Sequence, residues 1–579
     1  MIRVFYLLFF LAFCVSFSFS QDGLISVQVD TLKADYRTAG KGLDSIDIRL
    51  SEKHTTLPGG FLFHPFGKYG AEYGSVFHSL VNQNRPIEYT NIKYTGLPHV
   101  GMAYSFGSVG LQYLTTEYQQ SFSRNTHLNI LYQRSVNTGS FRYSGTANNT
   151  LTAKFYHNGN VLKHLVEIES INSYRSLNGG TSSDSIINNY GLEYASVLKQ
   201  NSSDSIKRVN FSMQQMLKLV GNDTSQIGLY TKNSLLINKR VYREIDSLTK
   251  FYLNVDDADT TRDLTQLSKL ENGVGIYAKS QQVKLSILCN RSYWYYKTQA
   301  SQYKTEYDLQ AKVVFNFRRF KVDYNQYQNF VGAKNQGSQS LHIVQSTPLF
   351  SQELNLINSY LLPNPMQRIY YSNTIDWQLP SSMSLQKNRG VNYKVSYNKI
   401  FPTTFSLGYV SKKNNYFFLD EKWRNDTLQL VGLVYFDASI KFNLGNFYLQ
   451  PRFMYNHIQG VSSIVPKYDI RGRFYWNKKM EKKKNIALLM GADFIYRSSY
   501  SLMSYDTRVS LYNLGNSTHT SREGTSIDAF VSLAIDEIRF YFKYENIDYF
   551  FGNKTSLIAV NYPATPTILR LGLTWDFFN

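Results

Sequence analysis

The sequence predicts an all-β protein, a transmembrane antiparallel up-and-down β-barrel of about 16–22 strands with short periplasmic turns and long external loops. Three observations favour this fold. Apolar and polar residues alternate along many segments that reach the roughly 9–11 residues needed to cross a bilayer at a tilt. Aromatic residues make up 15% of the chain, although its mean hydropathy is only −0.33. Short turns and long polar stretches also alternate along the C-terminal third.

The composition indicates a surface divided between an apolar and a polar face. Of the 579 residues, 18% are charged, below the roughly 25% of ordinary soluble domains. Only 13 prolines are present, and no Pro-, Ser- or Gly-rich linker separates parts of the chain. We therefore expect one large sheet rather than several domains.

A secretory signal peptide is expected at residues 1–20, MIRVFYLLFFLAFCVSFSFS, with cleavage before Gln21. A retained membrane anchor is the alternative. Lipid attachment at Cys14 is not expected, because Phe13 is too large for the position before a modified cysteine. The mature chain then holds Cys289 alone and has no internal disulfide. No later segment reaches the roughly 18 apolar residues of a membrane helix, so a closed barrel is the spanning structure that remains.

Two regions follow the signal peptide. Residues 21–85 precede any convincing strand and form either an N-terminal periplasmic extension or a small plug. Residues 86–579 form the outer-membrane barrel. Within it, residues 171–204 are rich in Ser and Asn and are expected to form a long loop.

Each expected strand has an apolar row on one face and a small or polar row on the other. The last strand is typical, because Leu569, Leu571, Leu573, Trp575 and Phe577 alternate with small or polar residues. In chain order, the expected strands cover residues 128–132, 151–155, 307–317, 391–397, 428–444, 447–455, 470–476, 486–496, 527–535, 538–544 and 569–577.

The connections between these strands alternate in length. Tight turns are expected at 445–446, 478–484 and 536–537, and longer polar stretches at about 412–427, 459–467, 497–524 and 550–566. If the C-terminus lies at the periplasmic rim, every tight turn falls on that rim and every long stretch on the other. Short periplasmic turns opposite long external loops are typical of outer-membrane barrels.

The C-terminal segments SIDAFVSLAIDEIRFYFKYENID (526–548) and VNYPATPTILRLGLTWDFF (560–578) resemble the end of the putative porins of the Bacteroidota. VNTGSFRYSG (136–145) and LNGG (177–180) resemble early strands of that family and the Asn-Gly-Gly after them. The family's amino-terminal LGNxG-like segment is not evident. The resemblance implies an outer-membrane barrel. It also implies that the last strand, with Leu569, Leu571, Leu573, Trp575 and Phe577, is the signal read by the barrel-assembly machinery.

The formal net charge of +20, from 62 Lys and Arg against 42 Asp and Glu, leaves two interpretations. Inward-facing cations could line a lumen and favour anions, because rings of charge select by sign. Alternatively, Asp437, Asp469, Asp493 and Asp528 pair with these cations and leave little net field. Nucleic-acid binding is not expected of an exported, strand-rich chain, and the lysine run at 477–485 is given no functional role. The candidate pore-lining residues are Lys312, Lys394, Lys441, Arg452, Arg471, Arg473, Arg539 and Lys543.

No catalytic or metal-binding motif stands out. The ten histidines form no close metal-binding cluster, and His64, His78 and His99 are expected on the surface or in loops. The acidic stretch 255–263 lacks the glycine and the downstream glutamate of a calcium loop, so a solvated loop is expected. We expect no cofactor, no metal and no enzymatic activity.

The function that best fits these features is an outer-membrane porin of a Gram-negative bacterium that passes small hydrophilic solutes passively, with a possible preference for anions. Its expected partners are outer-membrane lipid, lipopolysaccharide, the barrel-assembly machinery and the solutes, with a homo-oligomer left open. The alternatives are a non-conducting barrel for surface binding or assembly, an outer-membrane hydrolase, and a secreted soluble β-protein.

Overall fold

The computed structural model describes residues 27–31 and 90–578, with gaps at 141, 182–193, 223, 246–251, 253–254, 257–259, 333–334, 364, 381, 420, 427–430, 460–465, 482–485, 514–522, 552–556 and 564–565. The predicted signal peptide and most of residues 21–85 lie outside the described residues. Within 21–85, β1 (Val27–Thr31) pairs in parallel with β2 (Thr90–Tyr94).

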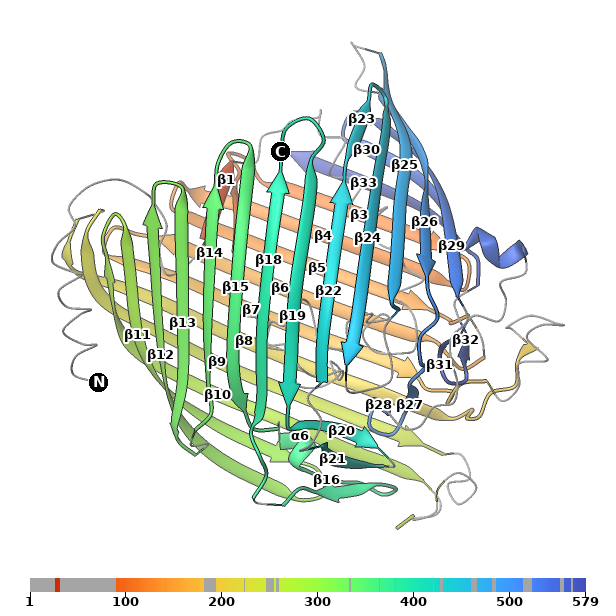
Figure 1. Ribbon diagram of the computed structural model, residues 1–579, viewed down its shortest axis with the longest axis horizontal. Helices are drawn as coiled ribbons and strands as arrows, with labels where there is room; N and C mark the ends of the chain where they lie inside the picture. Colours follow the sequence, from red (N-terminus) through yellow and green to blue (C-terminus); the bar gives the residue numbers. More distant parts are fainter. Residues whose placement is uncertain are drawn as a thin grey trace.

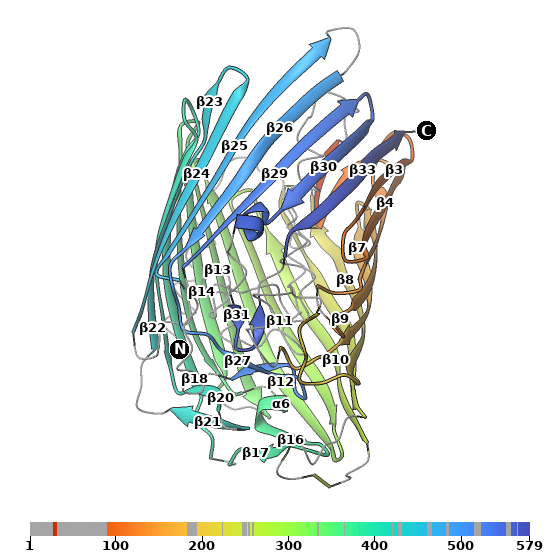
Figure 2. The ribbon, with the colours of Figure 1, turned by 90° about the vertical axis from the view of Figure 1, so that its right-hand side faces the viewer.

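The described chain forms a closed antiparallel barrel of 22 strands, which confirms the predicted fold class (Figures 1 and 2). Neighbours in sequence are neighbours in the barrel, and the first barrel strand pairs with the last, from His99 opposite Phe578 to Gly107 opposite Arg570. Closure leaves no unpaired sheet edge, the condition for a sheet in hydrocarbon.

The first half of the barrel contains β3 (His99–Gly107), β4 (Leu111–Ser123), β5 (Thr126–Asn137), β6 (Thr146–Asn158), β7 (Leu162–Ser176), β8 (Ser202–Gly221), β9 (Gln226–Glu244), β10 (Thr261–Lys279), β11 (Val283–Lys297), β12 (Ser301–Phe317) and β13 (Phe320–Val331). The second half contains β14 (Gly337–Ser346), β15 (Phe350–Leu361), β18 (Gln386–Tyr397), β19 (Thr403–Lys413), β22 (Val431–Ile440) with its continuation β23 (Phe442–Leu444), β24 (Phe447–Gln459), β25 (Tyr468–Glu481), β26 (Ile486–Arg497), β29 (Gly524–Ile535), β30 (Ile538–Glu545) and β33 (Ile568–Phe578).

The two-residue alternation separates an exposed apolar face from a buried polar one. Along β9, Ile227, Leu235 and Ile237 are exposed, whereas the intervening Asn238 and Arg240 are buried. The same rule places aromatic rings outside in the C-terminal third. Phe453 and Phe542 are exposed, and Phe436 packs against exposed Phe405 and Phe453. The apolar rows therefore form the outer surface of the barrel, as predicted.

The two rims differ in the length of their connections. On the rim that carries the C-terminus, at the top of Figure 1, each connection has two to five residues. These short turns are 124–125, 159–161, 222–225, 280–282, 318–319, 347–349, 398–402, 445–446, 482–485 and 536–537. The longest connections of the opposite rim are 177–201, 245–260, 362–385, 414–430, 498–523 and 546–567. The alternation predicted for the C-terminal third is confirmed and extends around the whole barrel.

Three predicted boundaries were wrong. The row at 428–444 is interrupted at Lys441, because Pro451 on the facing strand has no N–H to donate to the ladder. The expected tight turn at 478–484 is shorter, since β25 continues to Glu481. The expected loop at 171–204 starts later, because β7 continues to Ser176 with full pairing to β8.

Four of the long connections contain small hairpins of their own, and these were not predicted. The hairpins are β16 (Ile369–Tyr371) with β17 (Asp376–Gln378), β20 (Asn415–Leu419) with β21 (Lys422–Asp426), β27 (Ser504–Asp506) with β28 (Leu511–Asn513), and β31 (Leu557–Ala559) with β32 (Tyr562–Pro563). A single helical turn, α6 (Pro365–Arg368), precedes β16, and a 3₁₀ turn, η3 (Ile547–Phe551), follows β30.

Several aromatic rings lie across a glycine on the neighbouring strand. Tyr541 is paired with Gly572, and a Cβ placed on Gly572 would lie 2.1 Å from the Tyr541 Cζ. Tyr435 covers Gly408 in the same way, with Tyr435 Cζ also 2.1 Å from a Cβ built there. Each glycine thus leaves room for a ring flat against the inner wall.

We predict that Gly572→Ala destabilises the folded barrel by about 1–3 kcal/mol, because the added methyl displaces a packed ring. The measurement is urea unfolding in lipid vesicles. Gly472→Ala is the matched control, since a Cβ at Gly472 meets no atom within 4 Å. Equal unfolding midpoints for the two variants would contradict this account.

Candidate functional site

The four small hairpins gather at the long-connection end of the barrel, and we call them together the loop plug. In Figure 2, β27 and β31 lie within the outline of the barrel wall, whereas β16, β17, β20 and β21 lie at its lower end. The hairpins contact one another, β20 with β28 and β17 with β21. The long connections therefore fold back over and into the barrel and do not simply extend into solvent.

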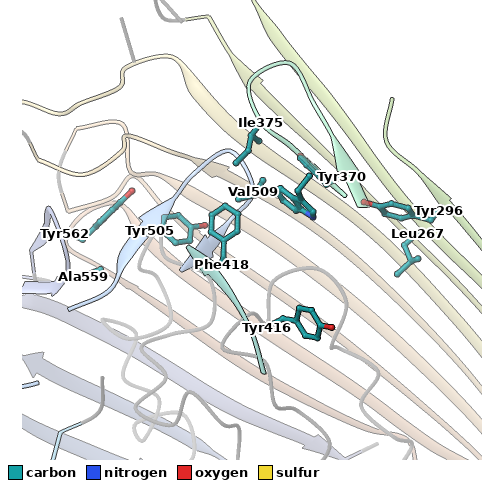
Figure 3. Packing of buried hydrophobic residues seen from close by; sticks show 11 residues of the cluster. Leu267, Tyr296, Tyr370, Ile375, Tyr416, Phe418, Tyr505, Val509, Ala559 and Tyr562 are labelled. Atoms are coloured by element: carbon teal, nitrogen blue, oxygen red, sulfur yellow. The ribbon is translucent and has the colours of Figure 1, made fainter. Parts of the chain in front are cut away.

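The loop plug has an apolar core to which all four hairpins contribute (Figure 3). The Trp377 ring stacks on Tyr370 with centroids 4.7 Å apart and meets the edge of Phe418 at 5.5 Å. Tyr505 meets Tyr562 edge to face, which joins β27 to β32. Burying each such ring contributes about 1.5–3 kcal/mol, so the plug has an apolar core of its own. The full cluster of buried residues is Leu267, Tyr296, Tyr370, Ile375, Trp377, Tyr416, Phe418, Tyr505, Val509, Ala559 and Tyr562.

Two members of this core come from the barrel wall, Leu267 on β10 and Tyr296 on β11. A polar contact fixes the plug to the same wall: the backbone N–H of Asn373 donates to Asp263 on β10 at 3.0 Å, and its side chain donates to Thr261 at 2.7 Å. The predicted solvated acidic loop at 255–263 is therefore wrong at its end, since Thr261 and Asp263 are buried in a strand.

A buried ionic cluster holds the β27–β28 hairpin to the wall at β7–β9. Asp204 on β8 accepts from Arg175 at 2.7 Å, from Arg240 at 3.1 Å and from the Ser510 hydroxyl at 2.9 Å. Arg240 on β9 also donates to the backbone carbonyls of Arg508 at 2.7 Å and Thr507 at 3.2 Å. Asp204 and Arg240 are each 1% exposed, so water does not screen this cluster.

This contact spans the lumen. The β27–β28 hairpin leaves the wall between β26 and β29, and β9 is separated from β29 by β30, β33 and β3–β8. The hairpin therefore reaches a distant part of the wall, and the Arg240–Asp204 cluster fixes it there. We infer that the loop plug narrows the lumen at the long-connection end.

Arg508 links three hairpins of the plug. Its guanidinium pairs with Asp506 at 2.7 Å, donates to the Thr374 carbonyl at 3.2 Å and contacts Glu421 next to β21. Burial by itself would raise the pKa of the Asp506 carboxyl, but Arg508 holds that pKa below its usual range. Burial lowers the pKa of Lys199, against the opposing effect of Glu244 at 3.1 Å. The Asp506–Arg508 pair therefore remains ionised at neutral pH.

The eight predicted pore-lining cations all lie on rows opposite the exposed apolar rows, which is the inward side. Lys441 is exposed near the short-turn rim, and Arg539 is buried. The other six pair with carboxylates: Lys312 with Asp323 at 3.6 Å, Lys394 with Glu353 at 3.0 Å, Arg452 with Asp437 at 2.6 Å, Arg471 with Asp469 at 2.7 Å, Arg473 with Asp493 at 2.6 Å, and Lys543 with Asp528 at 3.4 Å. The pairs that sequence analysis offered as the alternative are present in the structure.

The residues predicted as an assembly signal lie on β33. Leu569 and Leu571 are exposed on its outward side, and the Trp575 and Phe577 rings follow with centroids 3.9 Å apart. Because β33 pairs with both β30 and β3, this strand closes the barrel.

One histidine prediction was wrong. His99 is 3% exposed and contacts Asp576 at 3.1 Å across the closing strand pair. His64 and His78 lie outside the described residues. In the part of the chain that the structure describes, no group of three His, Cys, Asp or Glu side chains could hold a metal ion, and no helix is long and apolar enough to cross a membrane.

The loop plug is the feature that sequence analysis missed, although a signal was present. The connections expected as polar stretches contain dense aromatic and apolar clusters, such as NYFFL at 415–419 and IYYSNTIDW at 369–377. A solvated loop rarely has so many large apolar residues. Their density could have predicted a buried segment but not the wall against which it packs.

Comparisons with known proteins agree with the barrel. A family model described as "putative porin" matches residues 28–579. No curated protein matches the chain at a significant level.

Solved structures resemble the fold at low sequence identity. An iron transporter, FrpB of Neisseria meningitidis (F3-3 variant), is 10% identical with a TM-score of 0.59, covering 83% of this chain and 82% of its own. A siderophore receptor, PirA of Acinetobacter baumannii, is 12% identical with a TM-score of 0.59, covering 84% and 82%. The ferripyoverdine receptor of the outer membrane of Pseudomonas aeruginosa is 10% identical with a TM-score of 0.59, covering 84% and 73%. These likenesses show a shared fold.

We predict that Arg240→Met loosens the β27–β28 hairpin, because it leaves the buried Asp204 carboxylate with fewer donors. Removing one partner of a buried pair costs about 3–5 kcal/mol. Limited proteolysis of the protein in vesicles should therefore cut the 498–523 connection many times faster.

Arg452→Met is the matched control for that experiment. Its ion pair with Asp437 is partly exposed, and such a pair contributes only about 0–1 kcal/mol. The anchoring role of Arg240 is wrong if both variants are cut at the wild-type rate.

Proposed function

This chain belongs to the putative porin family, and from that membership we propose that it is an outer-membrane channel for small hydrophilic solutes. The observation that best supports the proposal is the two-faced wall: a closed barrel with apolar side chains outside and polar or charged side chains inside. Such a wall suits a protein that lipid surrounds and through which water and solutes pass. No chemical step is part of the proposal.

The loop plug gives the channel its size limit. A barrel of this strand number is wide, and barrels of 22 strands in outer-membrane transporters have a plugged lumen. In our proposal, solutes enter at the long-connection end through the space that the loop plug leaves, so the hairpins rather than the wall set the exclusion limit. Movement of the β27–β28 hairpin away from Arg240 would widen that space.

Uptake of a specific bound solute is a second candidate function. It is favoured by the resemblance of the fold to proteins described as an iron transporter and siderophore receptors, together with the obstructed lumen. A receptor of this kind would bind its solute tightly and would not pass unrelated sugars. A non-conducting surface-binding barrel and an outer-membrane hydrolase would likewise pass no current.

Conductance in a planar bilayer tests the channel proposal. We expect the purified protein to give stable current steps, with small neutral sugars reducing the current and large ones having no effect. Arg240→Met should raise the size limit, because the anchored hairpin is released. A protein that inserts into the bilayer and passes neither ions nor sugars would exclude a passive channel.

Wall charge is the basis of a further prediction. Replacing Arg452, Arg471 and Arg473 together by Gln should move the reversal potential in a salt gradient toward cation selectivity, because three inward carboxylates lose their partners. The control adds Asp437→Asn, Asp469→Asn and Asp493→Asn, which should restore the wild-type reversal potential. If the triple Gln variant keeps the wild-type reversal potential, these side chains do not face the permeation path.

A further inference from the structure

The short-turn rim has an uneven distribution of charge. Along the sector from β12 to β26, the hairpin tips stand next to one another at the top of Figure 1 and carry exposed cations. We call these six residues the basic arc: Arg318, Arg319, Lys399, Lys441, Lys478 and Lys479.

The sector contains almost no acidic residue to balance these cations. The turns 318–319, 347–349, 398–402 and 445–446 contain neither Asp nor Glu. The next sector, β29–β30–β33, is different, because its turn consists of the exposed acids Asp536 and Glu537. One part of the rim is therefore basic, and a neighbouring part is acidic.

Exposed apolar side chains lie directly beside the basic arc. Phe317 and Phe320, on either side of the two arginines, are each 45% exposed, and Ile400 next to Lys399 is 68% exposed. Leu444 and Met480 are 69% and 57% exposed. Large apolar groups at strand ends are typical of the boundary between hydrocarbon and headgroups. The cations one to three residues away then lie at the level of the lipid phosphates.

We propose that the basic arc binds the phosphodiester headgroups of anionic phospholipids in the leaflet next to the short turns. Adjacent Arg318 and Arg319 can each donate two hydrogen bonds to one phosphate, and the lysines add further positive charge. Apolar anchors and cations occur together here, which fits a lipid that has both an acyl chain and a charged headgroup. This inference depends on the membrane position of the barrel and not on whether it conducts.

Two tryptophans allow the two sectors to be compared within the same protein. Trp476 on β25 pairs with Phe447 and precedes Lys478 by two residues, so it reports on the basic arc. Trp575 on β33 pairs with Ile538, directly after the acidic turn. Both lie on outward rows near the short-turn rim. A Trp575→Phe variant isolates the change at Trp476, and a Trp476→Phe variant isolates the change at Trp575.

The experiment places the full protein in phosphatidylethanolamine vesicles that contain a minor fraction of phosphatidylglycerol, with bromine on the acyl chains of one lipid or the other. A cation near an anionic surface strengthens binding roughly fivefold. We therefore expect brominated phosphatidylglycerol to quench Trp476 severalfold more than its bulk fraction predicts, and Trp575 no more than that fraction predicts. Raising the salt from about 0.1 M to about 0.5 M should remove most of the excess.

Replacing all six residues of the basic arc by Gln should abolish the excess at Trp476. Replacing Arg452, Arg471 and Arg473 by Gln is the matched control, since it removes cations from the inner wall and should leave lipid quenching unchanged. If the six-residue variant does not fold, the comparison of Trp476 with Trp575 and the salt series still decide. Equal quenching by the two lipids at Trp476, or an equal excess at Trp575, would overturn the proposal.

Discussion

A backbone in hydrocarbon must pair all of its N–H and C=O groups within the protein, and this requirement shapes every other part of the molecule. The pairing of β3 with β33 meets it, because that contact converts a long sheet with two open edges into a closed wall. Once the wall is closed, the two sides of each strand face different solvents. The strict alternation of Leu569 and Leu571 with Arg570 and Gly572 follows from this separation.

A wide closed wall creates a second problem, which is what fills its interior. The protein folds its longest connections inward and gives them an apolar core of Tyr370, Trp377, Phe418 and neighbouring rings. Burying those loops also buries charge, and a buried charge is tolerated only when it is paired. Arg240 and Asp204 meet that requirement with two guanidiniums, a hydroxyl and two backbone carbonyls around a single contact.

The net charge of +20 is therefore distributed unevenly. Six of the eight candidate cations of the inner wall stand within ion-pair distance of carboxylates, so they add little to the net field of the lumen. The basic arc on the short-turn rim lies in turns without acidic residues. Positive charge that neighbouring carboxylates do not offset is thus concentrated where the wall meets the membrane surface, and a sum over the sequence could not reveal that placement.

Local sequence patterns were sufficient to predict which segments become strands, which face of each strand is apolar, and which rim has the short turns. These features follow from a period of two residues and from turn residues such as Gly445-Asn446. Four others required the folded chain: the count of 22 strands, the burial of NYFFL at 415–419, the place of His99 in a closing strand, and the hold of Arg240 on a hairpin distant in sequence. Each of those depends on contacts between residues far apart in the chain, and a periodic pattern carries no information about which distant partner it will meet.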